Sequence, residues 1–288
     1  MTAYTGGSAV ATTEAEIDSL KQQAQKIRRH IIEMLAAAGT GHPGGSLSAT
    51  DIVTALYFKV MRHKPDNPTW QDRDRFVLSK GHACPVLYAA LAEAGYITTD
   101  LLTSLRRFGS PLQGHPDRRK LGLVEASTGS LGIGLSLGIG LALAARLRGS
   151  PSRTYVMLGD GECEEGQIWE AAMFAAHQKL GNVCAIVDYN RLQLDAAVEE
   201  ITDLEPLGDK WRAFNWNVIE LDGHDYRQIL SALEQAGQVP DKPTVLVAST
   251  VKGKGVSYME NQLKFHGSVP DKREDIEKAL SEIGGTRS

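Results

Sequence analysis

The chain has 288 residues, of which 42% are hydrophobic and 23% charged, so it is long enough for one large or two small globular domains. A formal net charge of −4 gives no reason to expect a nucleic acid or an acidic membrane surface as a partner. The most apolar segment, 131–145, is rich in glycine and too short for a confident membrane span, and no signal peptide is evident. The three cysteines form no C-x-x-C pair, so we expect buried, reduced thiols and a cytoplasmic protein without membrane contact.

The N-terminal part is predicted to be helical. Thr13-x-x-Glu16 reads as a capping box, and apolar residues at helical spacing follow it, which predicts a helix over about 13–37. The glycine-rich stretch Gly39–Gly45 predicts a loop. Ser48-x-x-Asp51 then predicts the start of a second helix that runs to about Met61.

From residue 75 onward, predicted strands and helices alternate. The predicted strands are 75–79, 154–158, 183–188, 216–221 and 243–249, and the predicted helices are 83–94, 131–148, 162–180, 226–236 and 271–283. The strands are continuous apolar runs, which is typical of a mostly parallel sheet covered by helices on both faces. We therefore expect an α/β, doubly wound fold in a single domain spanning 1–288, with ligands bound at the carboxyl ends of the strands.

The acidic turn "GDGECEEG" at 159–166 follows one of these strands. It lacks the lysine of a P-loop and the spacing of a dinucleotide fingerprint, so neither common phosphate site fits. A divalent cation resolves the difficulty, because it can bridge carboxylates and a diphosphate. Asp160, Asn190 after the next strand, and the backbone carbonyl of Leu192 are the candidate ligands. The alternative is an Asp helix cap and an Asn in a turn.

Several stretches together resemble the transketolase branch of the thiamine diphosphate enzymes. The "GDG" with an Asn 30 positions beyond its Asp resembles the cofactor signature. Other similar stretches are "GTGHPGGSLS" at 39–48, "LSKGHACPVLYAAL" at 78–91, "GHPD" at 114–117, "STGSLGIGLS" at 127–136 and "KFHGSVP" at 264–270. The resemblance covers about residues 20 to 275 and implies the diphosphate-binding (PP-type) domain of that family.

The resemblance also implies the site residues. Thiamine diphosphate and Mg²⁺ are the implied cofactors, with Asp160, Asn190 and Leu192 as the metal ligands. The implied cofactor-binding residues are His82, Gly129, Ser130, Leu131, Gly161, Glu162, Asn190 and His266. The implied catalytic residues are His42, His115 and His266 in the substrate channel, and Glu165 in a carboxylate network at a subunit interface. An alternative for Glu165 is an acid that favours a helix N-terminus.

The implied activity needs a second polypeptide. Transketolases continue through a pyrimidine-binding domain, and the sequence stops soon after residue 275, so we expect the N-terminal subunit of a two-chain transketolase. Its expected partner is a C-terminal subunit carrying the pyrimidine-binding domain, in a heterotetramer that contains a homodimer of this chain. The expected reaction moves a two-carbon ketol unit between sugar phosphates, as in the pentose phosphate pathway.

Three alternatives remain open at this point. One is another thiamine diphosphate carboligase, such as a transketolase for unusual sugars or a deoxyxylulose phosphate synthase. Another is a non-catalytic protein that retains the cofactor fold. The third is a zinc enzyme using His82, Cys84 and His115, although their spacing matches no compact zinc motif. His224 also follows a glycine in a predicted loop, but it is interpreted as an ordinary loop histidine.

Overall fold

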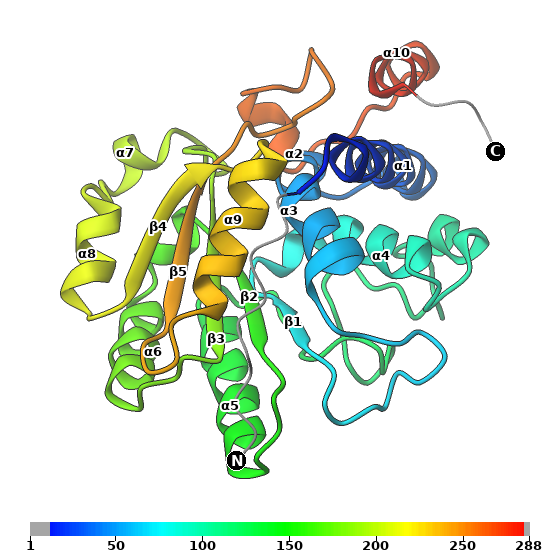
Figure 1. Ribbon diagram of the computed structural model, residues 1–288. Coiled ribbons are helices and arrows are strands. Elements are labelled where there is room, and N and C mark those ends of the chain that lie inside the picture. The colour runs from blue at the N-terminus through cyan, green and yellow to red at the C-terminus, as the bar shows by residue number, and fades with distance from the viewer. Residues whose placement is uncertain (1–11, 285–288) are drawn as a thin grey trace.

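A computed structural model describes residues 12–284 and shows a central sheet between two layers of helices (Figure 1). The sheet has five parallel strands in the order β1-β2-β3-β5-β4. The strands are β1 (Arg75–Leu78), β2 (Thr154–Gly159), β3 (Val183–Tyr189), β4 (Asn217–Asp222) and β5 (Thr244–Ser249). The prediction of a doubly wound α/β fold is therefore confirmed.

The predicted helices are present in their expected order. The α-helices are α1 (Glu14–Ala38), α2 (Pro43–Ser48), α3 (Thr50–Ala55), α4 (Cys84–Glu93), α5 (Ile133–Leu147), α6 (Gly166–His177), α7 (Val198–Ile201), α8 (Leu207–Ala213), α9 (Tyr226–Gly237) and α10 (Arg273–Ile283). Of these, α2, α7 and α8 are additional helices that the sequence analysis did not predict. The shorter helical segments are the π-helix η1 (Leu56–Val60) and the 3₁₀ turns η2 (Gly81–Ala83), η3 (Thr99–Ser104), η4 (Gly161–Glu164) and η5 (Leu263–His266). The capping box at Thr13 and Glu16 is present at the start of α1.

Both faces of the sheet are apolar because successive strand residues enter different cores. Val156 packs in the core formed with α5, α6 and α8, whereas the next residue, Met157, packs in the core formed with α1, α3, α4 and α9. Figure 1 shows α5 and α9 on opposite sides of the sheet. This arrangement explains why the strands read as continuous apolar runs. Cys84, Cys163 and Cys184 are buried free thiols, as expected.

Three local predictions, one of a loop and two of helices, need correction. Gly39–Gly45 is not entirely loop, because α2 begins at Pro43, where a missing N–H costs no helical hydrogen bond. Ser48-x-x-Asp51 does not cap the next helix, since both side chains form buried tertiary contacts instead. The predicted helix over 162–180 is a 3₁₀ turn, η4, followed by the shorter α6.

The strand register brings the predicted ligand edge together. Gly159 at the end of β2 pairs with Asp188 of β3, and Asp188 pairs with Ala248 of β5. The loops that follow β1, β2, β3 and β5 therefore leave the sheet side by side, as the parallel topology requires. Between residues 12 and 284, no helix combines the length and apolar character needed to cross a membrane.

Candidate cofactor and substrate site

Four histidines from different loops converge at this edge. The ring centroid of His42 lies 5.2 Å from that of His82, 5.6 Å from that of His266 and 6.4 Å from that of His115. His82 and His266 stack with their centroids 5.2 Å apart. The structure thus brings together the four histidines that the sequence selected, although more than 220 positions separate His42 from His266.

The position of each imidazole is determined by the helix, turn or loop in which its histidine lies. His42 precedes the N-terminus of α2, His82 lies in η2 directly after β1, and His266 ends η5. His115 lies on an exposed loop and contacts Gly129, which has a φ of +141°. A Cβ on Gly129 would approach the ring of His115 to 2.9 Å, so glycine is needed there for both conformation and space.

The four imidazoles are neutral near pH 7 because the pKa of each one is lowered. Burial lowers the pKa of His42 to about 4 and that of His266 to about 3. Burial also holds the pKa of His82 well below its ordinary value, and burial together with Arg106 lowers the pKa of His115. Neutral imidazoles have one nitrogen free to accept a proton. His42 Nδ1 is buried and, within residues 12–284, has no hydrogen-bond partner, so it is available to a ligand.

The proposed metal ligands, Asp160, Asn190 and the carbonyl of Leu192, are here called the oxygen cluster and lie on two turns that contact each other. Asp160 accepts hydrogen bonds from the backbone N–H groups of Gly161, at 2.8 Å, and of Arg191. Asn190 Oδ1 accepts from the backbone N–H of Leu192 at 3.2 Å. The carboxylate of Asp160 therefore contacts the turn that carries Asn190 and Leu192. These two turns follow the neighbouring strands β2 and β3, as the sequence predicts.

The donor set fits a hard divalent cation. A carboxylate, an amide oxygen and a backbone carbonyl are the oxygen ligands that Mg²⁺ takes from proteins, and each of these oxygens has a second lone pair. Burial, followed by the charge of Asp188, raises the pKa of Asp160 to about 6. A buried carboxylate with a raised pKa is stabilised in its charged form by a bound cation.

Two buried lysines, which the sequence analysis did not single out, complete the site. Lys252 Nζ lies 2.7 Å from both the carbonyl oxygen of Leu192 and Nδ1 of His266. Burial lowers the pKa of Lys252 to about 8. Lys80 donates to the carbonyl of Gly45 at 2.8 Å and forms a buried ion pair with Asp188. The available signal was the position of Lys80 directly after a predicted strand.

The remaining predicted residues lie around this centre. Glu162 accepts from the backbone N–H groups of Gly132 at 2.9 Å and Gly159 at 3.0 Å, and also from Ser79. Its carboxylate therefore braces the turns around the site. Glu165 is exposed and occupies the N-cap position of α6, but its side chain makes no capping hydrogen bond.

The glycine and loop positions of the prediction border the same centre. Ser130 and Leu131 are exposed next to Gly129. Gly161 follows Asp160 and lies against Gln193, which a Cβ at this position would approach to 2.8 Å.

The structure gives no support to a zinc centre. In the part of the chain between 12 and 284, no group of three or more His, Cys, Asp or Glu side chains is arranged to hold a metal ion. Cys84 Sγ instead contacts the backbone carbonyls of Gln113 and Gly114, at 3.5 and 3.2 Å.

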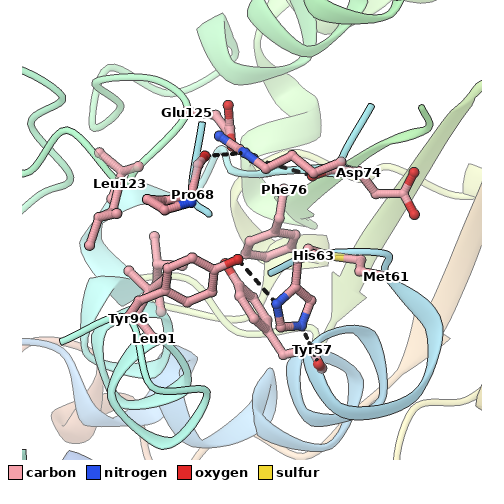
Figure 2. A pocket seen from close by; sticks show the side chains of 13 residues that line it. Tyr57, Met61, His63, Pro68, Asp74, Phe76, Leu91, Tyr96, Leu123 and Glu125 are labelled. Atoms are coloured by element: carbon pink, nitrogen blue, oxygen red, sulfur yellow. Dashed lines mark hydrogen bonds and ion pairs between the residues drawn. The ribbon is translucent and has the colours of Figure 1, made fainter. Parts of the chain in front are cut away.

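A small cavity elsewhere in the chain is a packing gap rather than a ligand site. Its volume is about 20 Å³, which is room for one water molecule. It lies beside Asp74 and Phe76 near the amino end of β1, whereas the histidines lie at the carboxyl end. Figure 2 shows Tyr96 and His63 facing one another along its wall, with their Oη and Nδ1 atoms 3.1 Å apart.

Comparison with known proteins supplies the family. Residues 19–287 match the family described as "Transketolase, thiamine diphosphate binding domain". The chain is 48% identical over 254 residues to the 6-deoxy-6-sulfo-D-fructose transketolase subunit SqwG of Clostridium sp. (strain MSTE9), covering 88% of this chain and 92% of that protein. It is 43% identical over 268 residues to an apulose-4-phosphate transketolase subunit of Phocaeicola vulgatus, covering 93% and 95% of the two chains.

Solved structures agree with this assignment. The transketolase of Campylobacter jejuni superposes with a TM-score of 0.87 at 34% identity, over 92% of this chain and 43% of that one. The chain thus spans less than half the length of the solved transketolases that it matches, but nearly all of the two bacterial transketolase subunits. With this match over most of its length, the chain belongs to the transketolase family and corresponds to its thiamine diphosphate-binding domain.

Proposed function

We propose that this chain is the cofactor-binding subunit of a two-chain transketolase. It would transfer a two-carbon ketol unit from a ketose phosphate to an aldose phosphate with thiamine diphosphate and Mg²⁺. The observation that carries the proposal is the convergence of His42, His82, His115 and His266 beside the oxygen cluster at Asp160 and Asn190.

The oxygen cluster would anchor the diphosphate through the metal. Asp160, Asn190 and the carbonyl of Leu192 would hold Mg²⁺, and phosphate oxygens would complete its shell. Because Gly161 has no side chain, the backbone there can approach the phosphates. The charge of Lys252, close to the Leu192 carbonyl, would offset part of the diphosphate charge.

The histidines would manage protons at the other end of the cofactor. Bound thiamine diphosphate supplies the electron sink that allows the bond between C2 and C3 of the ketose to break. The donor must lose a hydroxyl proton in this step, and the acceptor aldehyde must gain one. Neutral His42, whose Nδ1 has no hydrogen-bond partner among residues 12–284, would accept the hydroxyl proton of the donor, and His115 and His266 would bind the sugar hydroxyls.

The orientation of His266 follows from its neighbour. The ammonium of Lys252 can only donate to Nδ1 of His266, so the ring proton lies on Nε2. His266 would therefore present an N–H donor to an oxygen of the cofactor-bound sugar, while the same lysine holds the ring in place.

A partner polypeptide would complete the centre. The two relatives that this chain matches over 92% and 95% of their lengths are both named as subunits of a transketolase. By the family resemblance, the partner would carry the pyrimidine-binding domain, and two copies of this chain would form the core of a heterotetramer. Glu165, exposed at the start of α6, would lie at the contact between copies.

A second candidate is a transketolase specialised for an unusual sugar. The relatives named for 6-deoxy-6-sulfo-D-fructose and for apulose 4-phosphate, at 48% and 43% identity, favour it. Both candidates use the same two-carbon transfer and differ only in the donor and acceptor.

The test is reconstitution with a panel of sugars. The purified chain would be mixed with its partner polypeptide, Mg²⁺, thiamine diphosphate, a donor sugar and an acceptor aldehyde. The mass of the acceptor would be measured by mass spectrometry before and after the reaction. We expect an acceptor enlarged by two carbons with at least one donor among xylulose 5-phosphate, 6-deoxy-6-sulfofructose and apulose 4-phosphate. Cofactor binding without transfer from any donor would refute the activity, and the preferred donor would decide between the candidates.

A further inference from the structure

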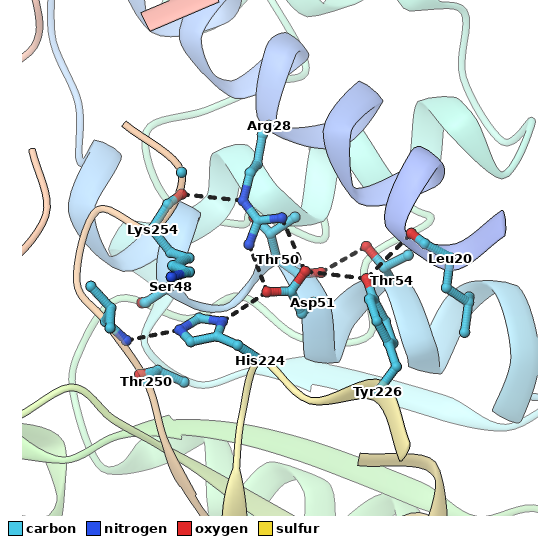
Figure 3. Close-up of polar contacts among 12 residues, drawn as sticks. Leu20, Arg28, Ser48, Thr50, Asp51, Thr54, His224, Tyr226, Thr250 and Lys254 are labelled. Atoms are coloured by element: carbon cyan, nitrogen blue, oxygen red, sulfur yellow. Dashed lines mark hydrogen bonds and ion pairs between the residues drawn. The ribbon is translucent and has the colours of Figure 1, made fainter. Parts of the chain in front are cut away.

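A buried polar network contacts residues 251 and 254, on either side of Lys252 in the candidate site. Figure 3 shows the polar contacts of this network. Its centre is Asp51 of α3, which forms a two-pronged ion pair with Arg28 of α1, with N–O distances of 3.0 and 2.6 Å. The hydroxyl of Tyr226 also donates to Asp51, at 3.2 Å, and His224 Nδ1 lies 2.7 Å from the same carboxylate. The network therefore joins α1, α3 and the segment between β4 and α9.

The geometry defines which nitrogen of His224 carries the proton. The backbone N–H of Val251 points at Nε2 of His224 from 2.9 Å, and a backbone N–H can only donate. Nε2 is therefore unprotonated, so the proton lies on Nδ1 and is donated to Asp51. His224 is thus a neutral bridge from the Asp51 carboxylate to the backbone at Val251.

The network holds one loop of the site from two sides. Val251 is bound by His224, and the carbonyl of Lys254 accepts a hydrogen bond from Arg28 Nε at 3.2 Å. Between these two anchors lies Lys252, whose Nζ reaches both the Leu192 carbonyl and His266. Arg28 and His224 are both oriented by Asp51, so one carboxylate controls both anchors.

We propose that His224, oriented by Asp51, is a positioning residue that fixes the 250–254 loop and thereby places Lys252 between the metal-binding turn and His266. The inference rests on the proposed cofactor site. It assigns a role to a histidine that belongs neither to the oxygen cluster nor to the four converging imidazoles, since its two ring nitrogens face Asp51 and Val251.

Two substitutions separate the two hydrogen bonds of His224. In His224→Gln, the amide oxygen reaches the position of Nε2 and can still accept from Val251. In His224→Asn, the amide nitrogen reaches the position of Nδ1 and can still donate to Asp51, but the acceptor for Val251 is lost. Since one neutral hydrogen bond is worth about tenfold at most, we expect His224→Asn to weaken binding of Mg²⁺–thiamine diphosphate by about tenfold and His224→Gln to stay within about threefold of the wild type.

His63 provides a matched control. Both of its nitrogens are also hydrogen-bonded, to Tyr96 and to the backbone carbonyl of Tyr57, but it lies at the other end of β1 (Figure 2). His63→Asn and His63→Gln should lower the thermal midpoint without changing cofactor affinity. Affinity would be measured by calorimetry on the full chain with its partner polypeptide, and the protection of the Val251 amide by hydrogen exchange on the full chain.

The two His224 variants are expected to give different results if the proposal is correct. Weak binding and fast Val251 exchange in His224→Asn, with both near wild-type values in His224→Gln, would support the proposal. Equal losses in the two variants, or wild-type affinity in His224→Asn, would overturn it. If the wild type itself binds no cofactor, the proposed function fails, and Val251 exchange alone still decides whether His224 holds the loop.

Discussion

At the scale of single residues, the chemistry of the site depends on what surrounds each side chain. Asp160 is a carboxylate whose burial raises its pKa to about 6, and its neighbours in the acidic turn are Glu162 and Glu164. Glu162 accepts hydrogen bonds from Ser79 and two backbone N–H groups, but burial still raises its pKa above the ordinary value. Of these acids, Asp160 is the one whose carboxylate contacts the turn that carries Asn190 and Leu192, where the proposed cation would bind.

Removing the charge of Asp160 should strongly weaken metal-dependent cofactor binding. Asp160→Asn keeps the shape but lowers the attraction for a divalent cation, and we expect a loss of at least about 100-fold in affinity for Mg²⁺–thiamine diphosphate, beyond the 10- to 100-fold range typical of outer-shell partners. Calorimetry with and without EDTA measures it. Asp195→Asn, an exposed acid on the same loop as Leu192, is the control and should bind normally. Unchanged binding by Asp160→Asn would exclude this carboxylate as a ligand.

At the scale of elements, the buried ion pair between Arg28 and Asp51 joins helices α1 and α3. Burial raises the pKa of Asp51, but the opposing charge of Arg28 and the hydrogen bond from His224 outweigh it, so the pKa lies well below the ordinary value. Because the folded-state pKa is depressed, this group stabilises the fold above its unfolded pKa, about 3.9. That stability is lost as the pH falls through the folded pKa.

The Asp51→Asn substitution tests this linkage. At pH 7 it leaves Arg28 buried without its counter-charge, and we expect unfolding to become easier by about 3–5 kcal/mol. The difference from the wild type should persist down to about pH 4 and shrink at lower pH, as the wild-type carboxylate is protonated too. Urea unfolding at pH 7, 5 and 3 measures it, with the exposed Asp100→Asn as control. A difference that grows below pH 4 would contradict the assignment.

The glycines of α5 have unequal roles. A Cβ on Gly134 would lie 2.3 Å from Ser79 Oγ and 2.6 Å from its Cα, so α5 could not pack as closely on β1. On Gly140 of the same helix, a Cβ would meet nothing within 4 Å.

Alanine at these two positions should therefore have opposite effects. We expect Gly134→Ala to destabilise the fold by about 1–3 kcal/mol through overpacking. Gly140→Ala should stabilise it by up to about 1 kcal/mol through helix propensity. Denaturant midpoints of the two variants measure the difference, and similar values for both would show that the close approach at Gly134 is not required.

At the scale of the whole molecule, the neighbouring helices α5 and α6 carry large apolar side chains that are exposed. Leu137 and Leu147 of α5 are 39% and 85% exposed, and Met173 and Phe174 of α6 are 58% and 46% exposed. The two helices pack against each other. We expect these two helices to form a protein contact, because exposed apolar side chains gathered on one surface mark such contacts, and Glu165 lies at the start of α6.

An acidic substitution on α6 tests the proposed homodimer of this chain. We expect Phe174→Asp to shift the native mass of the purified chain from that of a dimer to that of one copy, as measured by light scattering or native mass spectrometry. Ile201→Ser removes an exposed apolar side chain from α7, which lies apart from α5 (Figure 1), and should leave the mass unchanged. A dimer that survives Phe174→Asp would place the contact elsewhere.

Much of this description follows from local patterns in the chain. Continuous apolar runs predicted five parallel strands, because a strand buried on both faces has no polar positions. The same rule predicted that Asp160 and Asn190 lie at one edge. Segments whose conformation depends on distant partners were predicted less well. Ser48 and Asp51 have the spacing of a helix cap, but Asp188 and Arg28, each from another element, take their side chains.

Sequence by itself determined the α/β class and the ligand-binding edge, since these depend on hydrophobic periodicity, and the resemblance of its motifs to the transketolase family selected the four loop histidines. Only the tertiary structure decided that Lys252 lies against the Leu192 carbonyl and that His224 ties Val251 to Asp51. Those contacts join residues separated by tens to more than 170 positions, and no local spacing encodes them. The physical reason is that burial makes each polar group find a partner wherever the fold supplies one, and that partner is set by the packing of the whole chain.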